Sequence, residues 1–353
     1  MPATSVEGPA ALRLGPMRQL DFIEAGRLEW RDADEPSLEG DGQAIVRPVA
    51  VATCDLDRAL VMGAIPYQGP FAFGHEGVAE VVDVGDAVSS IKPGALVSVP
   101  FQISCGECAR CRRGQSGNCE SVPRLSMYGL PLGPDYGGFL SDAVRVPYAD
   151  AMLVAVPDGV DATAVASLSD NIPDAWRTVG PQLEAEPGAT VLICAGAGSI
   201  PLYATGIATA MGAERVDFAG GRPEEREVAE RLGANVVDED FPERLGPYPI
   251  TVDASGDRAG LACALRSTEP DGICTSVGIY FEPETPIPLL EIYTKGIRFA
   301  TGRPHARESM QPLLELVRDG RFSPELVTRE TASWDDAAEA LVDHRGKLVI
   351  SRD

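Results

Sequence analysis

Lysine and histidine are scarce in this chain of 353 residues. The formal net charge is -23, the only lysines are Lys92, Lys295 and Lys347, and there are three histidines. A surface with this excess of negative charge repels polyanions, whereas nucleic-acid binding needs a basic stripe that neutralises phosphates. The composition therefore argues against nucleic acid as a partner.

Long hydrophobic runs are also missing. No apolar run approaches the roughly 20 residues that are needed to cross a bilayer. Residues 1–16 lack the basic region followed by an apolar region that is typical of a secretion signal. We expect a cytoplasmic protein without a membrane partner, in which residues 1–16 form a flexible N-terminal extension before a first strand near Met17.

The chain is longer than a single hydrophobic core usually supports, so we expect two domains. Residues 17 to about 160 are short β runs separated by Gly and Pro, which is typical of a β-rich, barrel-like domain. From about residue 161, strands alternate with helices, and this βαβ rhythm predicts a parallel sheet in an α/β fold. The two amphipathic helices and the last strand after about residue 303 either cap this sheet or return to the first domain.

Four cysteines lie in one short segment with the spacing C-x-x-C-x-x-C-x7-C: Cys105, Cys108, Cys111 and Cys119. This spacing lets thiolates surround a tetrahedral ion without long loops. Disulfides are the alternative, but two-residue gaps bridge poorly and nothing else in the chain suggests export. We predict a closed structural zinc lobe over about residues 101–121.

A predicted strand at 190–196 runs into a glycine-rich turn and a helix, which is typical of a dinucleotide-binding loop. The candidate coenzyme residues in the turn are Gly196, Gly198, Ser199 and Ile200. Here glycines let the backbone approach a pyrophosphate that lies on the helix N-terminus. Pro201 takes the place of the usual third glycine, which the first helical turn tolerates. The alternative is a tight turn that binds no nucleotide.

The end of the next predicted strand indicates the coenzyme type. It carries Gly220, Gly221 and Arg222 and has no carboxylate that would hold the ribose hydroxyls of NAD(H). The glycines leave room for a 2′-phosphate and Arg222 offers it a bidentate donor. We therefore expect NADP(H) rather than NAD(H), unless Arg222 is only a solvated loop charge.

A second group of possible metal ligands consists of Cys54, His75 and Asp170. One cysteine, one histidine and one carboxylate can hold zinc with a fourth position open, which is the catalytic arrangement. Taken singly, the three residues could instead be a buried free thiol, a core histidine and a helix cap.

Together, these motifs resemble those of the zinc-dependent medium-chain alcohol dehydrogenases. The resemblance covers residues 17–353 and depends on the order of Gly74-His75-Glu76, the four-cysteine lobe, the coenzyme loop and a closing strand with Lys347. It implies a GroES-like catalytic domain over 17–160 and 303–353, interrupted by a Rossmann coenzyme domain over 161–302. The active site would lie in the cleft between them, and the family suggests a homodimer or homotetramer.

The resemblance also implies roles for individual residues. Cys54, His75 and Asp170 become the ligands of a catalytic zinc, with Glu76 and Asp57 close beside them. The protein would thus hold two zinc ions, one catalytic and one structural. Lys347 corresponds by position to a basic residue that contacts the coenzyme pyrophosphate, although a simple surface lysine is the alternative.

Two departures from the family pattern concern proton transfer. The motif reads Cys54-Asp55-Leu56-Asp57, so leucine stands where a hydroxyl usually passes the alcohol proton to solvent, and Ala59 stands where a histidine often lies. Asp174 replaces the threonine that usually follows the third ligand. Our hypothesis is that Asp174, or a chain of water molecules, replaces the missing relay.

The leading interpretation is an NADP(H)-dependent oxidoreductase that acts on a small-molecule alcohol or carbonyl: a secondary alcohol, a polyol or an aldehyde. A second one takes Leu56 and Ala59 as signs of a C=C or C=N reductase in which zinc is not directly catalytic. A third, from a different class, is a regulatory module that binds coenzyme without turnover.

Overall fold

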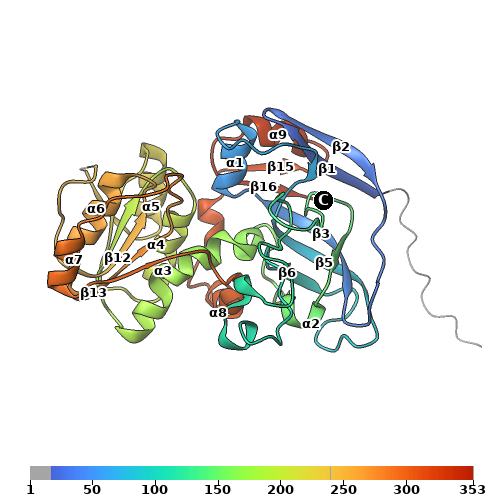
Figure 1. Ribbon diagram of the computed structural model, residues 1–353, viewed down its shortest axis with the longest axis horizontal. Helices are drawn as coiled ribbons and strands as arrows, with labels where there is room; N and C mark the ends of the chain where they lie inside the picture. The colour runs from blue at the N-terminus through green and yellow to red at the C-terminus, as the bar shows by residue number, and fades with distance from the viewer. Residues whose placement is uncertain (1–16, 239, 353) are drawn as a thin grey trace, which may run out of the picture.

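The computed structural model describes residues 17–238 and 240–352, which form two lobes side by side (Figure 1). The predicted extension of residues 1–16 lies outside these described residues. The strands are β1 Met17–Glu24, β2 Arg27–Ala33, β3 Ala44–Ala52, β4 Phe71–Ala72, β5 Glu76–Val84, β6 Leu96–Val99, β7 Val144–Val146, β8 Val154–Ala155, β9 Val191–Ala195, β10 Val216–Gly220, β11 Asn235–Val237, β12 Tyr248–Ala254, β13 Thr268–Ser276, β14 Arg298–Thr301, β15 Glu330–Ser333 and β16 Leu348–Ser351. The α-helices are α1 Asp55–Val61, α2 Ala149–Met152, α3 Asn171–Ala185, α4 Ile200–Ala210, α5 Pro223–Arg231, α6 Arg258–Ser267, α7 Leu289–Lys295, α8 Ala306–Arg318 and α9 Ala337–Asp343. The 3-10 helices are η1 Cys111–Arg113, η2 Ser116–Asn118, η3 Ala166–Ser169 and η4 Pro324–Val327.

One lobe, here called the parallel-sheet lobe, contains a six-stranded sheet in the order β11-β10-β9-β12-β13-β14, in which neighbouring strands run parallel. The first strand of this lobe, β9, lies in the middle and is buried along its whole length. Val191 and Ile193 pack in one core with residues of α3 and α4, whereas Leu192 and Cys194 pack in another with residues of α6. Helices on both faces explain why this strand is hydrophobic throughout rather than alternating.

The chain order of these strands is 3-2-1-4-5-6, which is the order of a doubly wound dinucleotide-binding sheet. The order reverses at β9, and the chain continues on either side into β10 and β12. In such sheets the ligand crevice opens outside the carboxyl ends of the strands at this reversal. The predicted glycine-rich turn begins there, directly after Ala195.

The other lobe, here called the β-rich lobe, contains a three-stranded sheet β2-β1-β4 and a seven-stranded sheet. The larger sheet has the order β15-β16-β3-β5-β6-β8, with β7 added beside β3. A core that includes Leu20, Val46, Val97, Tyr128 and Phe139 fills the space between the sheets. The last strand, β16, pairs antiparallel with β3, so the chain ends in the first lobe. Helix α8 instead packs on α3, and its residues Leu313 and Leu314 belong to the same core as Val191 and Ile193.

Within the two described ranges, no helix has both the length and the apolar character that crossing a membrane requires.

Close backbone packing fixes the segment that leads into β5. Gly129 has φ +67°, and a Cβ atom there would lie 2.3 Å from the carbonyl oxygen of Gly74. Gly137 has a similar φ of +81°, but a Cβ atom there would meet nothing within 4 Å. A side chain at Gly137 would therefore cause backbone strain alone, whereas a side chain at Gly129 would cause both strain and a steric clash.

We expect Gly137→Ala to lower the free energy of unfolding by about 1–2 kcal/mol, which is the cost of a left-handed conformation for alanine. Gly129→Ala should cost clearly more, because the new methyl group also collides with the backbone at Gly74. Urea denaturation of both variants measures the difference, and equal losses would contradict this account.

Candidate functional site

The structure brings the three predicted ligands of the second metal group together from distant parts of the chain. Cys54 precedes α1, His75 precedes β5, and Asp170 lies between η3 and α3. One ligand atom each from Cys54, His75, Glu76 and Asp170 lies within 4.8 Å of the others. His75, Glu76 and Asp170 are all buried.

Hydrogen bonds hold Cys54 in place, and carboxylates lie close to both ring nitrogens of His75. The backbone N–H of Cys54 donates to Asp57 Oδ2 at 2.8 Å, and the N–H of Asp57 donates back to the Cys54 carbonyl at 3.1 Å. The other carboxylate oxygen of Asp57 lies 3.4 Å from His75 Nδ1, while His75 Nε2 lies 3.4 Å from Asp170 Oδ2. A carboxylate on one ring nitrogen of a histidine is the usual way to orient the other nitrogen toward a metal.

The electrostatics of this cluster favour a cation. Burial raises the pKa of the Cys54 thiol, and the carboxylates of Asp170 and Glu76 raise it further. Burial also raises the pKa of Glu76 to about 8, although Lys347 opposes this change. Burial would lower the pKa of His75, but the carboxylates of Asp57 and Asp170 raise it to about 9. The buried acidic groups outnumber the cations beside them, so a bound cation would stabilise the cluster. Zinc, a borderline-soft divalent cation, fits this mixed set of S, N and O donors.

A buried polar network extends the cluster toward the glycine-rich turn. Lys347 Nζ donates to Glu76 Oε2 at 2.8 Å, with both side chains almost fully buried. The Asn171 amide, oriented to satisfy its neighbours, donates from nitrogen to Glu76 Oε1 at 2.8 Å and to Asp170 Oδ2 at 3.2 Å. Its oxygen accepts from the Ser199 hydroxyl at 2.8 Å and from Lys347 at 3.2 Å. One amide thus links the metal cluster to the turn.

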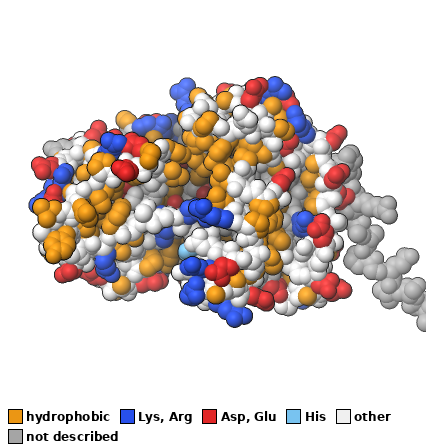
Figure 2. All heavy atoms as spheres, in the orientation of Figure 1, with side chains coloured by type: hydrophobic (Ala, Val, Ile, Leu, Met, Phe, Trp, Pro, Cys, Tyr) orange, Lys and Arg blue, Asp and Glu red, His pale blue; other side chains and the backbone are white. Residues whose placement is uncertain are grey.

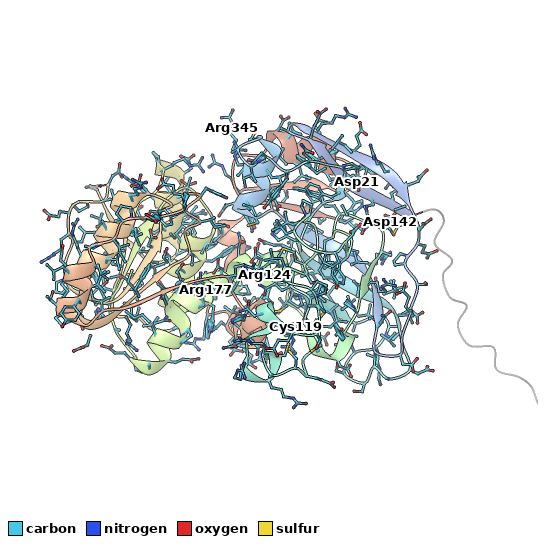
Figure 3. All side chains as sticks on the ribbon, viewed as in Figure 1. Asp21, Cys119, Arg124, Asp142, Arg177 and Arg345 are labelled. Atoms are coloured by element: carbon cyan, nitrogen blue, oxygen red, sulfur yellow. The ribbon has the colours of Figure 1, made fainter. Side chains whose placement is uncertain are left out.

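Asp174, the predicted substitute relay, lies one helical turn beyond Asp170 and is buried. Its carboxylate lies 2.5 Å from Arg177 Nε, and Figure 3 places Arg177 close to the junction of the two lobes. Burial raises the pKa of Asp174 to about 6 while Arg177 opposes the shift. Leu56, at the usual hydroxyl position, packs against the core of the β-rich lobe.

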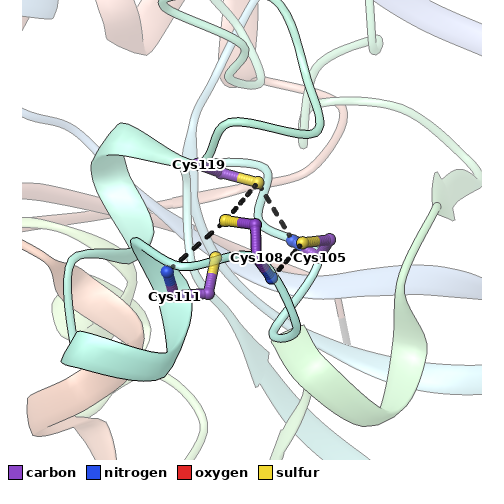
Figure 4. Close-up of side chains that lie close together, drawn as sticks. All are labelled: Cys105, Cys108, Cys111 and Cys119. Atoms are coloured by element: carbon purple, nitrogen blue, oxygen red, sulfur yellow. Dashed lines mark hydrogen bonds between the residues drawn. The ribbon is translucent and has the colours of Figure 1, made fainter.

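The four cysteines of the predicted zinc lobe also converge (Figure 4). Their sulfur atoms lie within 4.8 Å of one another, and all four thiols are free. Backbone N–H groups point at these sulfurs: Cys108 N–H donates to Cys105 Sγ at 3.3 Å and Glu120 N–H to Cys108 Sγ at 3.4 Å. Backbone hydrogen bonds from Cys111 and Glu120 lower the pKa of Cys108 to about 6. Such donors stabilise thiolates, so four converging sulfurs with this support suit a tetrahedral zinc ion.

A pocket of about 370 Å³ lies between the lobes and fits the size range of ligand sites. Cys54 lines this pocket, so it extends from the metal cluster to the glycine-rich turn. Four predicted coenzyme residues line it: Gly198, Ser199, Arg222 and Lys347. The other four are not among its lining residues: Gly196, Ile200, Gly220 and Gly221.

Two of these predicted coenzyme residues are already engaged within the protein. Arg222 Nε donates to both carboxylate oxygens of Glu225 at 3.0 Å. Lys347 is not a surface lysine, because its ammonium group is buried on Glu76. Lys347 is therefore not free to meet a phosphate without a change of partner, whereas the Arg222 side chain is 44% exposed and keeps N–H donors beyond those bound to Glu225.

The structure adds two residues to the site that sequence reasoning missed. Asn171 directly follows the predicted ligand Asp170, and this adjacency in sequence was an available signal. Asp55 directly follows Cys54 and lines the pocket, where it accepts a hydrogen bond from Ser199 N–H. No sequence signal indicates that contact, because the partners are 144 residues apart in the chain.

The buried pair of Lys347 and Glu76 yields a stability prediction. Lys347→Met should lower the free energy of unfolding by about 3 kcal/mol, since it leaves Glu76 buried without its partner. The same change should cost clearly less in a Glu76→Gln background. Lys92→Met is the matched control: Lys92 is exposed and its replacement should stay within about 0.5 kcal/mol. If chemical denaturation showed that the effects of Lys347→Met and Glu76→Gln on the free energy of unfolding add, the result would contradict this pairing.

Comparisons with known proteins agree with this geometry. Residues 40–158 match the model of the alcohol dehydrogenase GroES-like domain. The chain is 27% identical over 321 residues to zinc-type alcohol dehydrogenase B of Aspergillus flavus, covering 86% of this chain and 72% of that protein. It is 29% identical over 344 residues to the NADP-dependent isopropanol dehydrogenase of Thermoanaerobacter brockii, covering 92% and 95%.

A solved structure, alcohol dehydrogenase TADH from Thermus sp. ATN1, superimposes with a TM-score of 0.86 at 26% identity, covering 95% of this chain and 100% of that one. The predicted family and fold class are thereby confirmed. The chain belongs to the zinc-dependent medium-chain alcohol dehydrogenase family and is an oxidoreductase enzyme.

Proposed function

We propose that this enzyme transfers a hydride between NADP(H) and an alcohol or its carbonyl counterpart, with a secondary alcohol, a polyol or an aldehyde as the substrate class. The observation that carries this proposal is the continuity of the metal cluster with the pocket. Cys54 belongs to both, and the pocket continues to Ser199 at the start of α4. A substrate on the metal and a coenzyme on the glycine-rich turn would therefore share one space.

We assign Cys54, His75 and Asp170 as the residues that hold a catalytic zinc, which would supply Lewis-acid polarisation of the substrate oxygen. Asp57 lies 3.4 Å from His75 Nδ1, where it would favour the cationic or metal-bound ring, and Lys347 and Asn171 hold Glu76 in place. Three protein ligands would leave a fourth position of the metal for substrate. Cys105, Cys108, Cys111 and Cys119 would hold a second, structural zinc.

We propose NADP(H) as the preferred coenzyme. Support comes from the missing carboxylate at the end of β10 and from Arg222 at the pocket wall. The relative from Thermoanaerobacter brockii carries NADP dependence in its name. Glu225 pairs with Nε and Nη2 of Arg222, so a 2′-phosphate would meet the remaining N–H donors of a guanidinium group whose charge is partly balanced.

We further propose the predicted division into a catalytic domain (17–160 and 303–353) and a coenzyme domain (161–302), and a homo-oligomer as the native state. Exposed apolar side chains support the second point. Leu289, Leu290 and Tyr293 of α7 and Phe281 before it are 65–81% exposed, at the far end of the parallel-sheet lobe (Figures 1 and 2). Apolar groups gathered on one surface in this way are typical of a protein interface.

Metal analysis combined with activity tests the proposed function. The wild-type protein should contain two zinc ions per chain and reduce ketones faster with NADPH than with NADH. His75→Ala and Cys111→Ser should each lose one zinc, but only His75→Ala should lower ketone reduction by about a hundredfold or more, because only that site polarises the substrate. Cys263→Ala is the control: it removes a thiol from the core of the parallel-sheet lobe and should keep both zinc ions.

Other outcomes of that experiment identify other functions. Ketone reduction that survives His75→Ala would indicate a C=C or C=N reductase in which zinc is not directly catalytic. Absence of NADP(H) binding together with an unmetallated Cys54–His75–Asp170 site would indicate a regulatory module without turnover.

The pH dependence of turnover tests the role of Asp174. With a pKa of about 6, this carboxyl is ionised above pH 6 and can accept a proton, so alcohol oxidation should rise as pH increases through 6. Asp174→Asn should remove this rise and lower turnover at pH 7.5 by about a hundredfold. Asp319→Asn, at the exposed end of α8, is the control. A profile that is the same in Asp174→Asn and wild type would exclude Asp174 from proton transfer.

A further inference from the structure

The start of α4 is the part of the pocket that a coenzyme pyrophosphate needs, and a carboxylate already lies on it. Asp55 accepts the backbone N–H of Ser199 through Oδ2 at 3.1 Å and through Oδ1 at 3.3 Å. The carboxylate also lies directly over the preceding residue: a Cβ atom on Gly198 would be only 2.6 Å from Asp55 Oδ2. Asp55 belongs to α1 of the β-rich lobe, whereas Ser199 belongs to the parallel-sheet lobe.

This N–H group matters because it lies at the start of a helix. Backbone N–H groups and the helix dipole at the N-terminus bind phosphate in dinucleotide sites. Pro201, in the first turn of α4, has no N–H, so the helix start has one donor fewer and the Ser199 N–H is one of those that remain. The hydroxyl of Ser199 is engaged by Asn171.

The nearby cations do not neutralise Asp55. Among the described residues no Lys, Arg or His nitrogen lies within 4 Å of its carboxylate. Lys347 is bound to Glu76 and Arg222 to Glu225. Lys347 acts on Asp55 electrostatically but forms no ion pair with it. A dinucleotide would therefore bring two phosphate charges against a carboxylate without an ion-pair partner, and like charges at contact distance repel strongly in a pocket.

We propose that Asp55 is a built-in competitor for the coenzyme: its carboxylate occupies the Ser199 N–H at which the pyrophosphate would bind, and it thereby weakens coenzyme binding and speeds coenzyme release. The proposal deepens the proposed function and rests on it. It predicts that removal of this carboxylate from the binding pocket strengthens coenzyme binding, whereas removal of a polar residue from a pocket usually weakens it.

Equilibrium binding to the purified full-length protein tests this inference without any need for turnover. Asp55→Asn and Asp55→Ala should each lower the Kd of NADPH at least tenfold, which is about 1.4 kcal/mol. ADP, which carries a pyrophosphate, should show the same gain, whereas adenosine, which carries none, should bind equally to all variants. Asp335→Asn removes the same charge from an exposed residue that does not line the pocket, and should leave every Kd unchanged.

The outcomes separate the two proposals. If the wild-type protein binds NADPH but neither Asp55 variant binds it more tightly, the competitor role is wrong while the proposed function stands. A gain for adenosine equal to that for ADP would also overturn the role, since the effect would then not involve phosphate. If neither the wild type nor the variants bind NADPH or NADH, the proposed function fails and this inference fails with it.

Discussion

Buried negative charge around a single imidazole is the constraint on which the site depends. Cys54, Glu76, Asp170 and Asp57 surround His75, and Lys347 is the one cation that contacts this group among the described residues. Placing several carboxylates in a low-dielectric interior is unfavourable unless cations balance them. Lys347 balances Glu76, and a metal ion beside Cys54 and Asp170 would balance the charge that remains on the other groups.

The same network connects the candidate metal ligands with the glycine-rich turn. The Asn171 amide donates to Asp170 and Glu76 and accepts from Ser199. One side chain therefore contacts both the candidate metal ligands and the start of α4. Asp55 contacts Ser199 from the other lobe through its backbone N–H. The start of α4 is thus held from two directions before any dinucleotide arrives, and the two lobes meet through polar groups rather than through packing alone.

Much of the fold could be predicted from the sequence because its signals are local. The hydrophobic run of β9, the turn after it and the βαβ rhythm depend on neighbouring residues, and the sheet has the expected parallel form. The convergence of Cys105, Cys108, Cys111 and Cys119 could be predicted for the same reason, since four cysteines within one short segment have few geometric choices. The path of the C-terminal segment could not be decided, because the pairing of β16 with β3 joins residues about 300 apart.

The site divides in the same way. By itself, the sequence determined which side chains could bind a metal and where a dinucleotide could approach the backbone, because residue type and spacing set that chemistry. Only the tertiary structure decided which charges meet. It buried Lys347 on Glu76, paired Arg222 with Glu225, and set the carboxylate of Asp55 on Ser199. Electrostatic energy depends on distance through space and on burial, and neither can be read from positions along a chain.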